Sequence, residues 1–184
     1  MIYIDKKGNW FSSKQSDQIL SYIETLQDKK LNIKSHFNLD IFPQLIKEVD
    51  LFYPALHGPN GEDGSIQGLF QICGIPCIGS GVLGSAVGMD KIIMKAIFSC
   101  ADLPQVPFIA LNKIEINEER TLNSRIKIIE EKIGYPCFIK PANLGSSLGI
   151  TKASNKNQLI EGINFASGFD QRIVIEKGIE AREL

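Results

Sequence analysis

The chain has 184 residues, of which 43% are hydrophobic and 22% are charged, and its formal net charge is -1. This is the composition of an ordinary globular protein, which excludes disorder throughout the chain. The balanced charge excludes a general attraction to nucleic acid or anionic lipid, and no apolar run is long enough to cross a bilayer. We therefore expect a cytoplasmic protein that recognises its partners at local sites, with neither nucleic acid nor membrane among them.

The first third of the chain predicts two short strands, a surface segment and a strand that ends in a polar loop. Residues 2–4 and 9–11 flank a polar turn, a pattern typical of paired strands. Residues 12–35 are polar and weakly patterned, so we expect a surface insertion there. The apolar run 51–56 predicts a buried strand, and it ends abruptly in the glycine-rich loop 57–64. Loops of this kind are where α/β sheets bind ligands.

The next segment predicts a helix and a domain boundary. A helix is expected at residues 65–73, followed by a short strand at residues 76–78 and the small-residue stretch 79–88. The composition changes after this stretch. We therefore predict two domains, residues 1–88 and residues 89–184.

Asp90 is placed to cap the first helix of the second domain. In this helix Ile93 and Ile97 share one face, while Lys91 and Lys95 share another. We assign Lys95 to a solvated part of the helix.

The second half of the chain alternates strands and helices. We expect a strand at 106–111, a helix at 122–133 that ends at Gly134, a strand at 136–140, a loop at 141–148, a strand at 149–152, a helix capped by Ser154 and a strand at 172–176. The sequence stops soon afterwards, at Leu184, without a cap or polar tail. We interpret this as truncation rather than the end of a domain.

The four cysteines, Cys73, Cys77, Cys100 and Cys137, lie inside apolar segments. Cys73 and Cys77 are separated by residues typical of a turn between a helix and a strand, which disfavours a metal site. We expect reduced, buried thiols.

A glycine pattern in residues 79–84 matches G-x-G-x-x-G, the spacing of dinucleotide-binding turns. Asp102 lies near the distance expected of the acid that binds ribose, but it follows a helix, whereas that acid should end a second strand. A dinucleotide-dependent oxidoreductase is therefore the weaker interpretation. No G-x-x-x-x-G-K-[ST] sequence occurs, which excludes a Walker-type loop.

Lys140 ends a predicted strand and precedes a loop that contains Gly145, Ser146 and Ser147. The main-chain N–H groups and hydroxyls of such a loop can surround phosphate oxygens while the ammonium neutralises their charge. The alternative for these residues alone is a solvated hairpin with a surface lysine.

Residues 174–179 leave a predicted strand with charged groups followed by the apolar Ile179. The main chain of such a segment can pair with adenine while Ile179 packs on the ring, and Glu183 can accept hydrogen bonds from ribose. Read alone, the segment is equally a strand end with salt-bridging charges.

His57 lies with Glu62 and Asp63 in the loop after a predicted strand. Its imidazole can donate a hydrogen bond to a developing carboxyl or phosphoryl oxygen. A structural histidine that fixes the loop is the alternative.

Taken together, residues 55–64, residues 89–91, Lys140 with residues 145–147, and Glu176 with Glu183 resemble the D-alanine-D-alanine ligase family in order and spacing. The resemblance implies an α/β fold. It consists of a partial pre-ATP-grasp α/β domain on the substrate side, followed by the first, central subdomain of an ATP-grasp fold.

The resemblance implies that the protein joins two D-alanine molecules through an acyl phosphate, with ATP, for peptidoglycan precursor synthesis. Its implied partners are ATP and D-alanine, and a homodimer is open to test. The implied site residues are Lys91 and Lys140 at the ATP phosphates, Gly145, Ser146 and Ser147 in the loop over them, Glu176, Lys177 and Ile179 at adenine, Glu183 at ribose, and His57 and Glu62 near the reacting carboxylate. By the same resemblance, Ser146 also belongs to a hydrogen-bond network that orders the closing loop.

The resemblance places the Mg²⁺ ligands of the family beyond Leu184. Glu115 and Asn117 imitate the Glu-x-Asn metal motif but lie upstream of the phosphate loop, so we assign no metal ligand in this sequence. We expect the polypeptide alone to be an inactive, incomplete fragment.

Three other functions stay open on this sequence. One is a non-catalytic nucleotide-binding module, alone or with a second chain. Another is a ligase that takes D-lactate or D-serine as its second substrate. The third is the oxidoreductase considered above.

Overall fold

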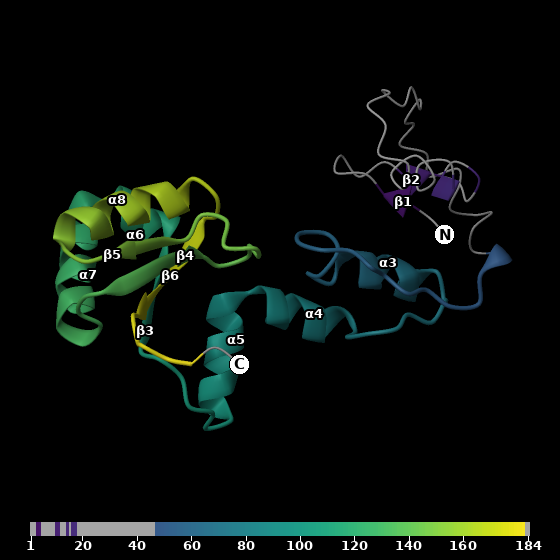
Figure 1. Cartoon of the computed structure of the whole chain (residues 1–184), viewed down its shortest axis with the longest axis horizontal. Helices are drawn as coiled ribbons and strands as arrows, with labels where there is room; N and C mark the ends of the chain where they lie inside the picture. Colours follow the sequence, from purple (N-terminus) through teal and green to yellow (C-terminus); the bar gives the residue numbers. More distant parts are fainter. Residues whose placement is uncertain (1–2, 5–9, 12–13, 15, 18–46, 183–184) are drawn as a thin grey trace. The chain divides into compact units, whose positions relative to one another are not determined.

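The computed structural model describes residues 3–4, 10–11, 14, 16–17 and 47–182 (Figure 1). Strands β1 (Tyr3–Ile4) and β2 (Trp10–Phe11) pair antiparallel, which confirms the two strands predicted around the polar turn. Nearly all of the predicted surface insertion at 12–35 lies outside the described residues, and so does Glu183.

The chain divides into two compact units. The first comprises residues 1–52 with 73–76, and the second comprises residues 53–72 with 77–184. The second unit contains every helix and strand discussed below. The domain boundary between residues 88 and 89 stays a prediction.

Two predicted strands are wrong. Residues 51–56 and 76–78 form isolated bridge positions at Phe52 and Cys77 instead, with a hydrogen bond of 2.9 Å from Phe52 N to Pro76 O. Residues 51–56 are apolar, but their side chains alternate between exposed and half-buried, so they do not form a fully buried strand.

The predicted helix after the polar loop is confirmed as α3 (Ser65–Ile72). The small-residue stretch forms a helix of its own, α4 (Val82–Met89), which was not predicted because glycines disfavour helix interiors. A turn at Gly79, with φ +111°, precedes it rather than a strand. The glycine pattern therefore lacks the strand that a dinucleotide-binding turn requires.

Helix α5 (Lys91–Cys100) starts as predicted, because Oδ1 of Asp90 accepts hydrogen bonds from Ile92 N and Ile93 N at 3.0 and 3.1 Å. The burial of its two faces is the reverse of that in a usual amphipathic helix. Ile93 and Ile97 are exposed, while Lys95 is buried.

Four antiparallel strands form the main sheet, in the order β3-β6-β4-β5. They are β3 (Phe108–Asn112), β4 (Cys137–Pro141), β5 (Thr151–Ala153) and β6 (Arg172–Lys177), close to the predicted ranges. The last strand in the chain thus lies in the middle of the sheet. Its run of Ile173, Val174 and Ile175 is fully buried, as suits β-branched residues in a central strand.

The two predicted helices are confirmed as α7 (Glu119–Lys132) and α8 (Lys156–Ser167), and both pack on one face of this sheet (Figure 1). Asn155, rather than the predicted Ser154, caps α8, since its side chain accepts from Gln158 N at 3.0 Å. The short helix α6 (Lys113–Asn117) was not predicted, and a capping box between Asn112 and Glu115 starts it. The core of this face consists of Leu111, Ile116, Ile126, Ile129, Ile133, Cys137, Ile139, Ala153, Leu159, Ile163, Ala166, Ile173 and Ile175.

The alternation of side chains along β6 separates this core from the candidate site. Ile173 and Ile175 belong to the core, so Val174 and Glu176 point to the opposite face. That face carries the charged groups described below.

All four cysteines are free, but the prediction that they are all buried is wrong. Cys137 is buried, Cys73 and Cys77 are half-buried, and Cys100 is exposed. Burial raises the pKa of Cys137 to about 11. Within the described part of the chain, no helix is both long and apolar enough to span a membrane.

Candidate functional site

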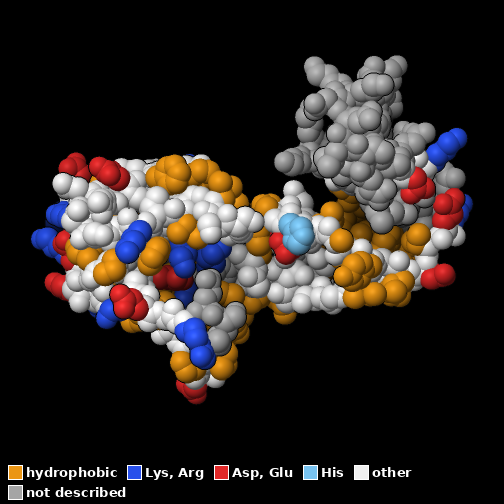
Figure 2. All heavy atoms as spheres, viewed as in Figure 1, with side chains coloured by type: hydrophobic (Ala, Val, Ile, Leu, Met, Phe, Trp, Pro, Cys, Tyr) orange, Lys and Arg blue, Asp and Glu red, His pale blue; other side chains and the backbone are white. Residues whose placement is uncertain are grey.

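Two lysines converge on the carboxylate of Glu176, near the end of β6. Nζ of Lys140, from β4, lies 2.6 Å from Oε2 of Glu176, and Nζ of Lys95, from α5, lies 3.1 Å from Oε1. Lys95 and Glu176 are each only 8% exposed. Figure 2 shows Lys and Arg side chains gathered around acidic groups between the sheet and α5. The prediction that Lys95 is solvated is therefore wrong, because the charge of Glu176 offsets the cost of burying its ammonium.

The sheet register explains why these groups meet. Phe138 on β4 and Phe108 on β3 both lie opposite Glu176, and Lys140 lies opposite Val174. Residues that face one another across antiparallel strands share a face of the sheet, so Lys140 and Glu176 are diagonal neighbours. Lys95 completes the cluster from above the Phe108 ring, with Nζ 5.2 Å from the ring centroid.

The pKa of Glu176 is lower than its ordinary value. Burial alone would raise it, but the hydrogen bonds and positive charges of Lys140 and Lys95 outweigh the burial. The carboxylate therefore stays ionised at neutral pH.

This shift predicts how stability depends on acid. Because the folded pKa of Glu176 is depressed, its contribution to stability is complete above the ordinary value of 4.5 and is lost as the pH falls through the folded pKa. We expect Glu176→Gln to flatten the fall of the thermal midpoint between neutral pH and about pH 3. Glu131→Gln, at an exposed position of α7, is the control and should keep the full fall. An unchanged acid dependence in Glu176→Gln would refute the assignment.

Lys91 lies beside this cluster and contacts the loop after β4. Its main-chain N donates to Ala142 O at 3.0 Å, and its Nζ donates to Leu144 O. Burial and the neighbouring charge of Lys140 lower the pKa of Lys91, against the opposing effect of Glu176 and nearby aspartates. Lys91 thus adds a third positive charge beside the Glu176 carboxylate, which already pairs with Lys95 and Lys140.

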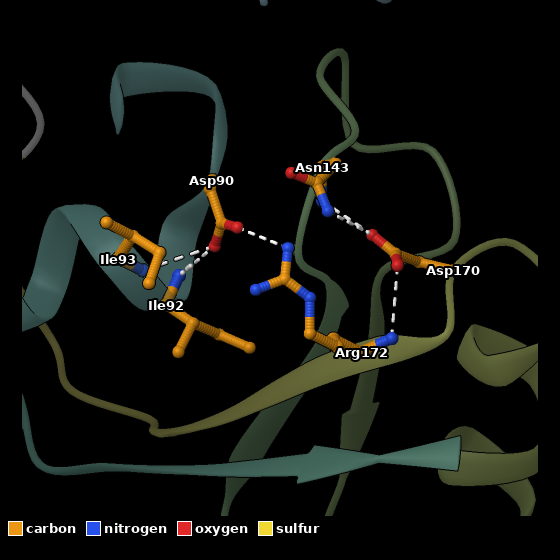
Figure 3. Close-up of polar contacts among 6 residues, drawn as sticks. All are labelled: Asp90, Ile92, Ile93, Asn143, Asp170 and Arg172. Carbon is orange, nitrogen blue, oxygen red and sulfur yellow. Dashed lines mark hydrogen bonds and ion pairs between the residues drawn. The ribbon is translucent and has the colours of Figure 1, made fainter. Parts of the chain in front are cut away.

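A second set of polar contacts fixes the start of α5 to the sheet (Figure 3). Oδ2 of Asp90, the residue that caps α5, accepts from Nη2 of Arg172 on β6. Asp170 accepts from the main-chain N and the side-chain Nδ2 of Asn143, each at 2.8 Å, and from Arg172 N at 3.0 Å. These contacts therefore hold the start of α5 and Asn143, three residues after Lys140, against the start of β6.

The loop between β4 and β5 presents its main chain outward. Ser146 and Ser147 have φ of 52° and 58°, a left-handed conformation that is uncommon for serine, and both are exposed. Leu148 N donates to Gly145 O at 3.1 Å and closes the turn. Among the described residues, the N–H groups of Gly145, Ser146 and Ser147 have no partner, so they are available to an anion.

The segment after Glu176 has fewer free main-chain hydrogen-bond donors than the sequence predicts. Lys177 N donates to Pro107 O at 3.0 Å and Gly178 N donates to Pro136 O at 2.8 Å, so both donors are used. Ile179 is 58% exposed, and its N–H has no partner within the part of the chain that the structure describes. Since lysines occupy the Glu176 carboxylate, an adenine contact in this segment would depend on the main chain and on Ile179.

His57 lies in a different cluster of contacts. Its Nδ1 is 3.8 Å from Oε1 of Glu62, and Oε2 of Glu62 accepts from Gly58 N at 2.6 Å. The imidazole is 92% exposed. Asp63 fixes the same loop by accepting from Asn60 N and Ser65 N at 2.8 and 2.9 Å. The contacts therefore join His57 to Glu62 and do not join either residue to the lysines.

Glu115 has a structural role in the described chain. It takes part in the capping box of α6 and pairs with Nε of Arg125 at 3.2 Å. In the described ranges, no group of three or more His, Cys, Asp or Glu side chains lies close enough to hold a metal ion.

The sequence interpretation missed the participation of Lys95 and the frame of Asp90, Asp170 and Arg172. A signal for Lys95 was present, because residues four apart in a helix share a face. Because Lys91 faces the loop between β4 and β5, Lys95 is expected on the same side of α5. No comparable signal identifies Arg172, whose partner is 82 residues away in the sequence.

Comparison with known proteins decides the family. A model described as D-ala D-ala ligase N-terminus matches residues 1–80, and one described as D-ala D-ala ligase C-terminus matches residues 97–184. The chain belongs to the D-alanine-D-alanine ligase family. This confirms the resemblance read from the sequence.

The curated relatives of this D-alanine-D-alanine ligase family member include ligases of Prochlorococcus marinus and Synechococcus. The D-alanine-D-alanine ligase of one Prochlorococcus marinus strain is 51% identical over 185 residues, covering 100% of this chain and 52% of the relative. That of a Synechococcus strain is 46% identical over 184 residues, again covering 100% of this chain and 52% of the relative. The chain thus spans about half the length of the curated relatives it matches.

Solved structures of the family confirm the predicted fold class. The D-Ala:D-Ser ligase VanG of Enterococcus faecalis is similar with a TM-score of 0.73 and 30% identity, over 98% of this chain and 52% of that chain. The D-alanine-D-alanine ligase of Coxiella burnetii has a TM-score of 0.74 at 22% identity, over 98% of this chain and 54% of that chain. The chain has the α/β architecture of about half of such a ligase, a partial ATP-grasp fold.

Proposed function

We propose that this chain supplies ATP-binding groups of a ligase that joins two D-alanine molecules. The observation that carries the proposal is the pairing of Lys95 and Lys140 with Glu176, with Lys91 close enough to interact with the charges of Lys140 and Glu176, beside a loop with free main-chain donors. Membership of the family supports it.

The lysines and the loop at residues 145–147 fit the phosphates of a nucleoside triphosphate. The lysines carry more positive charge than Glu176 neutralises, so bringing the anionic phosphates close to them is favourable. The outward N–H groups of residues 145–147 can donate to phosphate oxygens. An anion near Lys91 would also favour its charged form, which burial now disfavours.

In this proposal ATP provides the phosphoryl group that activates the carboxylate of the first D-alanine as an acyl phosphate, and the amine of the second D-alanine displaces phosphate. Lys91 and Lys140 neutralise and orient the phosphates, with Gly145, Ser146 and Ser147 over them. Chemistry of this kind depends on positioning and charge neutralisation rather than on a protein nucleophile.

The remaining site residues keep the roles predicted from the resemblance. Ile179 and Lys177 would hold adenine with the main chain near Glu176, and Glu183 would hold ribose. His57, with Glu62, would donate to the reacting carboxylate, which suits its exposed imidazole. Ser146 would also belong to the network that orders the closing loop.

Mg²⁺ belongs to the proposed reaction, but the described residues do not form a site for it. We further propose a cytoplasmic role in peptidoglycan precursor synthesis, and we leave a homodimer to a measurement of molecular mass. The similarity to a D-Ala:D-Ser ligase keeps D-serine as an alternative second substrate.

Nucleotide selectivity tests the proposal. Isothermal titration calorimetry of the 184-residue chain should show tighter binding of ATP than of NAD, because the lysine cluster and loop favour a triphosphate and the glycine pattern at 79–84 lacks its strand. Tighter binding of NAD would favour the oxidoreductase instead. A chimaera with the remainder of the Prochlorococcus marinus ligase should release phosphate from ATP only when D-alanine is present.

A further inference from the structure

The two lysines on Glu176 differ in their access to a ligand. The side chain of Lys140 is 25% exposed, whereas that of Lys95 is 10% exposed and lies on the other oxygen of the carboxylate. A phosphate group can therefore approach Lys140 more readily than Lys95. Direct contact with a ligand therefore does not explain why Lys95 is buried beside Glu176.

Lys95 is seated by its surroundings on three sides. Its ammonium lies over the Phe108 ring, 5.2 Å from the centroid, and its partner Glu176 lies opposite Phe108 in the sheet. Its main-chain oxygen accepts from Nε2 of Gln105 at 2.9 Å, and the same Nε2 lies 2.9 Å from Oγ of Ser99. The Gln105 hydrogen bond holds the main chain of Lys95, while the Phe108 ring and Oε1 of Glu176 contact its ammonium.

The charges of one trio, Lys95, Glu176 and Lys140, determine how much positive charge Lys140 presents to a ligand. With Lys95 on one oxygen, Glu176 is already balanced, and the positive charge of Lys140 remains available. Without Lys95, the carboxylate would neutralise Lys140 and could bind it with both oxygens, which would turn its ammonium away from the ligand. The burial of the trio makes this effect larger than it would be in water.

We propose that Lys95 is a positioning residue, which occupies one oxygen of Glu176 so that Lys140 keeps its charge and orientation for phosphate. The inference rests on the proposed function, because it assigns a role in the same phosphate site. It assigns that role to a residue that does not itself contact the nucleotide.

Substitution of the buried lysine tests the proposal. Lys95→Met in the full chain should weaken the binding of ATP and of inorganic tripolyphosphate about tenfold, the effect of losing one charge-assisted interaction. Lys95→Arg should restore most of the binding, since it returns the charge to the same carboxylate. Lys127→Met, at an exposed position of α7, is the matched control and should bind like the unaltered chain.

A double variant separates positioning from a merely structural role. In Lys95→Met with Glu176→Gln, no carboxylate neutralises Lys140, so most of the tripolyphosphate binding should return. Tripolyphosphate carries no adenine, and its binding reports on the phosphate site alone. Circular dichroism of each variant shows whether it is folded, and the double variant keeps the test valid if the loss of the Lys95 charge beside Glu176 prevents Lys95→Met from folding.

The outcomes distinguish the two proposals. Weak binding by Lys95→Met together with recovery in the double variant supports the positioning role. ATP binding that is unchanged in a folded Lys95→Met, or tripolyphosphate binding that stays weak in a folded double variant, overturns that role and leaves the proposed function intact. An unaltered chain that binds neither ATP nor tripolyphosphate overturns the proposed function and the positioning role with it.

Discussion

Lys140→Met is expected to weaken ATP binding by about 10- to 150-fold, which corresponds to about 1.5 to 3 kcal/mol for a hydrogen bond to a charged group. Lys140 is the more exposed of the two cations on Glu176 and lies directly before the phosphate loop. Methionine keeps the length and the apolar stem of lysine, so the substitution removes mainly the charge. Calorimetric titration with ATP measures the effect.

The fold should survive this substitution, because Lys95 still pairs with Glu176. Lys127→Met, which removes an exposed charge from α7, is the control for the change in net charge. Equal affinities for ATP in the two variants would show that Lys140 does not contact the phosphates.

Gly149→Ala is expected to destabilise the chain by about 2 to 4 kcal/mol, as the sum of left-handed backbone strain and overpacking. Gly149 has φ +73°, and a Cβ there would lie 2.6 Å from Cγ of Pro141 and 3.0 Å from Cδ2 of Phe169. Both neighbours are rings, which cannot turn away as a flexible side chain does. Urea denaturation followed by circular dichroism measures the loss.

Gly145→Ala in the same loop is the matched control. A Cβ at Gly145 has no atom within 4 Å, and the φ of Gly145 lies outside the left-handed region. We expect its free energy of unfolding to match that of the unaltered chain within about 1 kcal/mol. If both variants lose the same stability, the tight packing around Gly149 does not constrain the loop.

The strands and the two long helices of the second half could be predicted one by one because local patterns determine them, whereas the order of the strands in the sheet was not predicted. The spacing of Leu122, Ile126, Ile129 and Ile133 predicts a helical face, and the structure buries Ile126, Ile129 and Ile133 against the sheet. The β-branched run at 173–175 likewise predicts the strand that becomes β6. Periodicity of this kind predicts structure well, because the residues that form the repeat are the ones that pack in the core.

Predictions failed where the environment contradicts the residue type. Residues 51–56 are apolar and yet remain partly exposed, and glycine-rich residues 82–89 nevertheless form a helix. Lys95 was placed in solvent because it lies on the helix face opposite Ile93 and Ile97. Its shared face with Lys91 indicates which side of α5 it occupies, but its burial depends on Glu176, 81 residues later, which that spacing does not identify.

The sequence named Lys91, Lys140 and Glu176 as ligand-binding residues but did not predict their contacts with one another. In the structure Lys140 and Lys95 pair with the Glu176 carboxylate, and Lys91 lies close enough to Lys140 and Glu176 for their charges to shift its pKa. Their roles toward ATP stay predictions, as do those of His57 and Ser146. Sequence motifs identify the candidate residues, whereas the sharing of one carboxylate depends on the register of β4 and β6.

The position of β6 has a consequence for how the chain is made. β6 is synthesised after β3, β4 and β5, yet it lies between β3 and β4. During synthesis, β3 and β4 therefore lack their central partner at least until residue 177 has been added. At about 5 to 20 residues per second, this interval is on the order of seconds. During that interval the nascent chain exposes unpaired strand edges, the feature that invites aggregation. Shelter of these edges by a chaperone is thus expected to matter most just before β6 emerges.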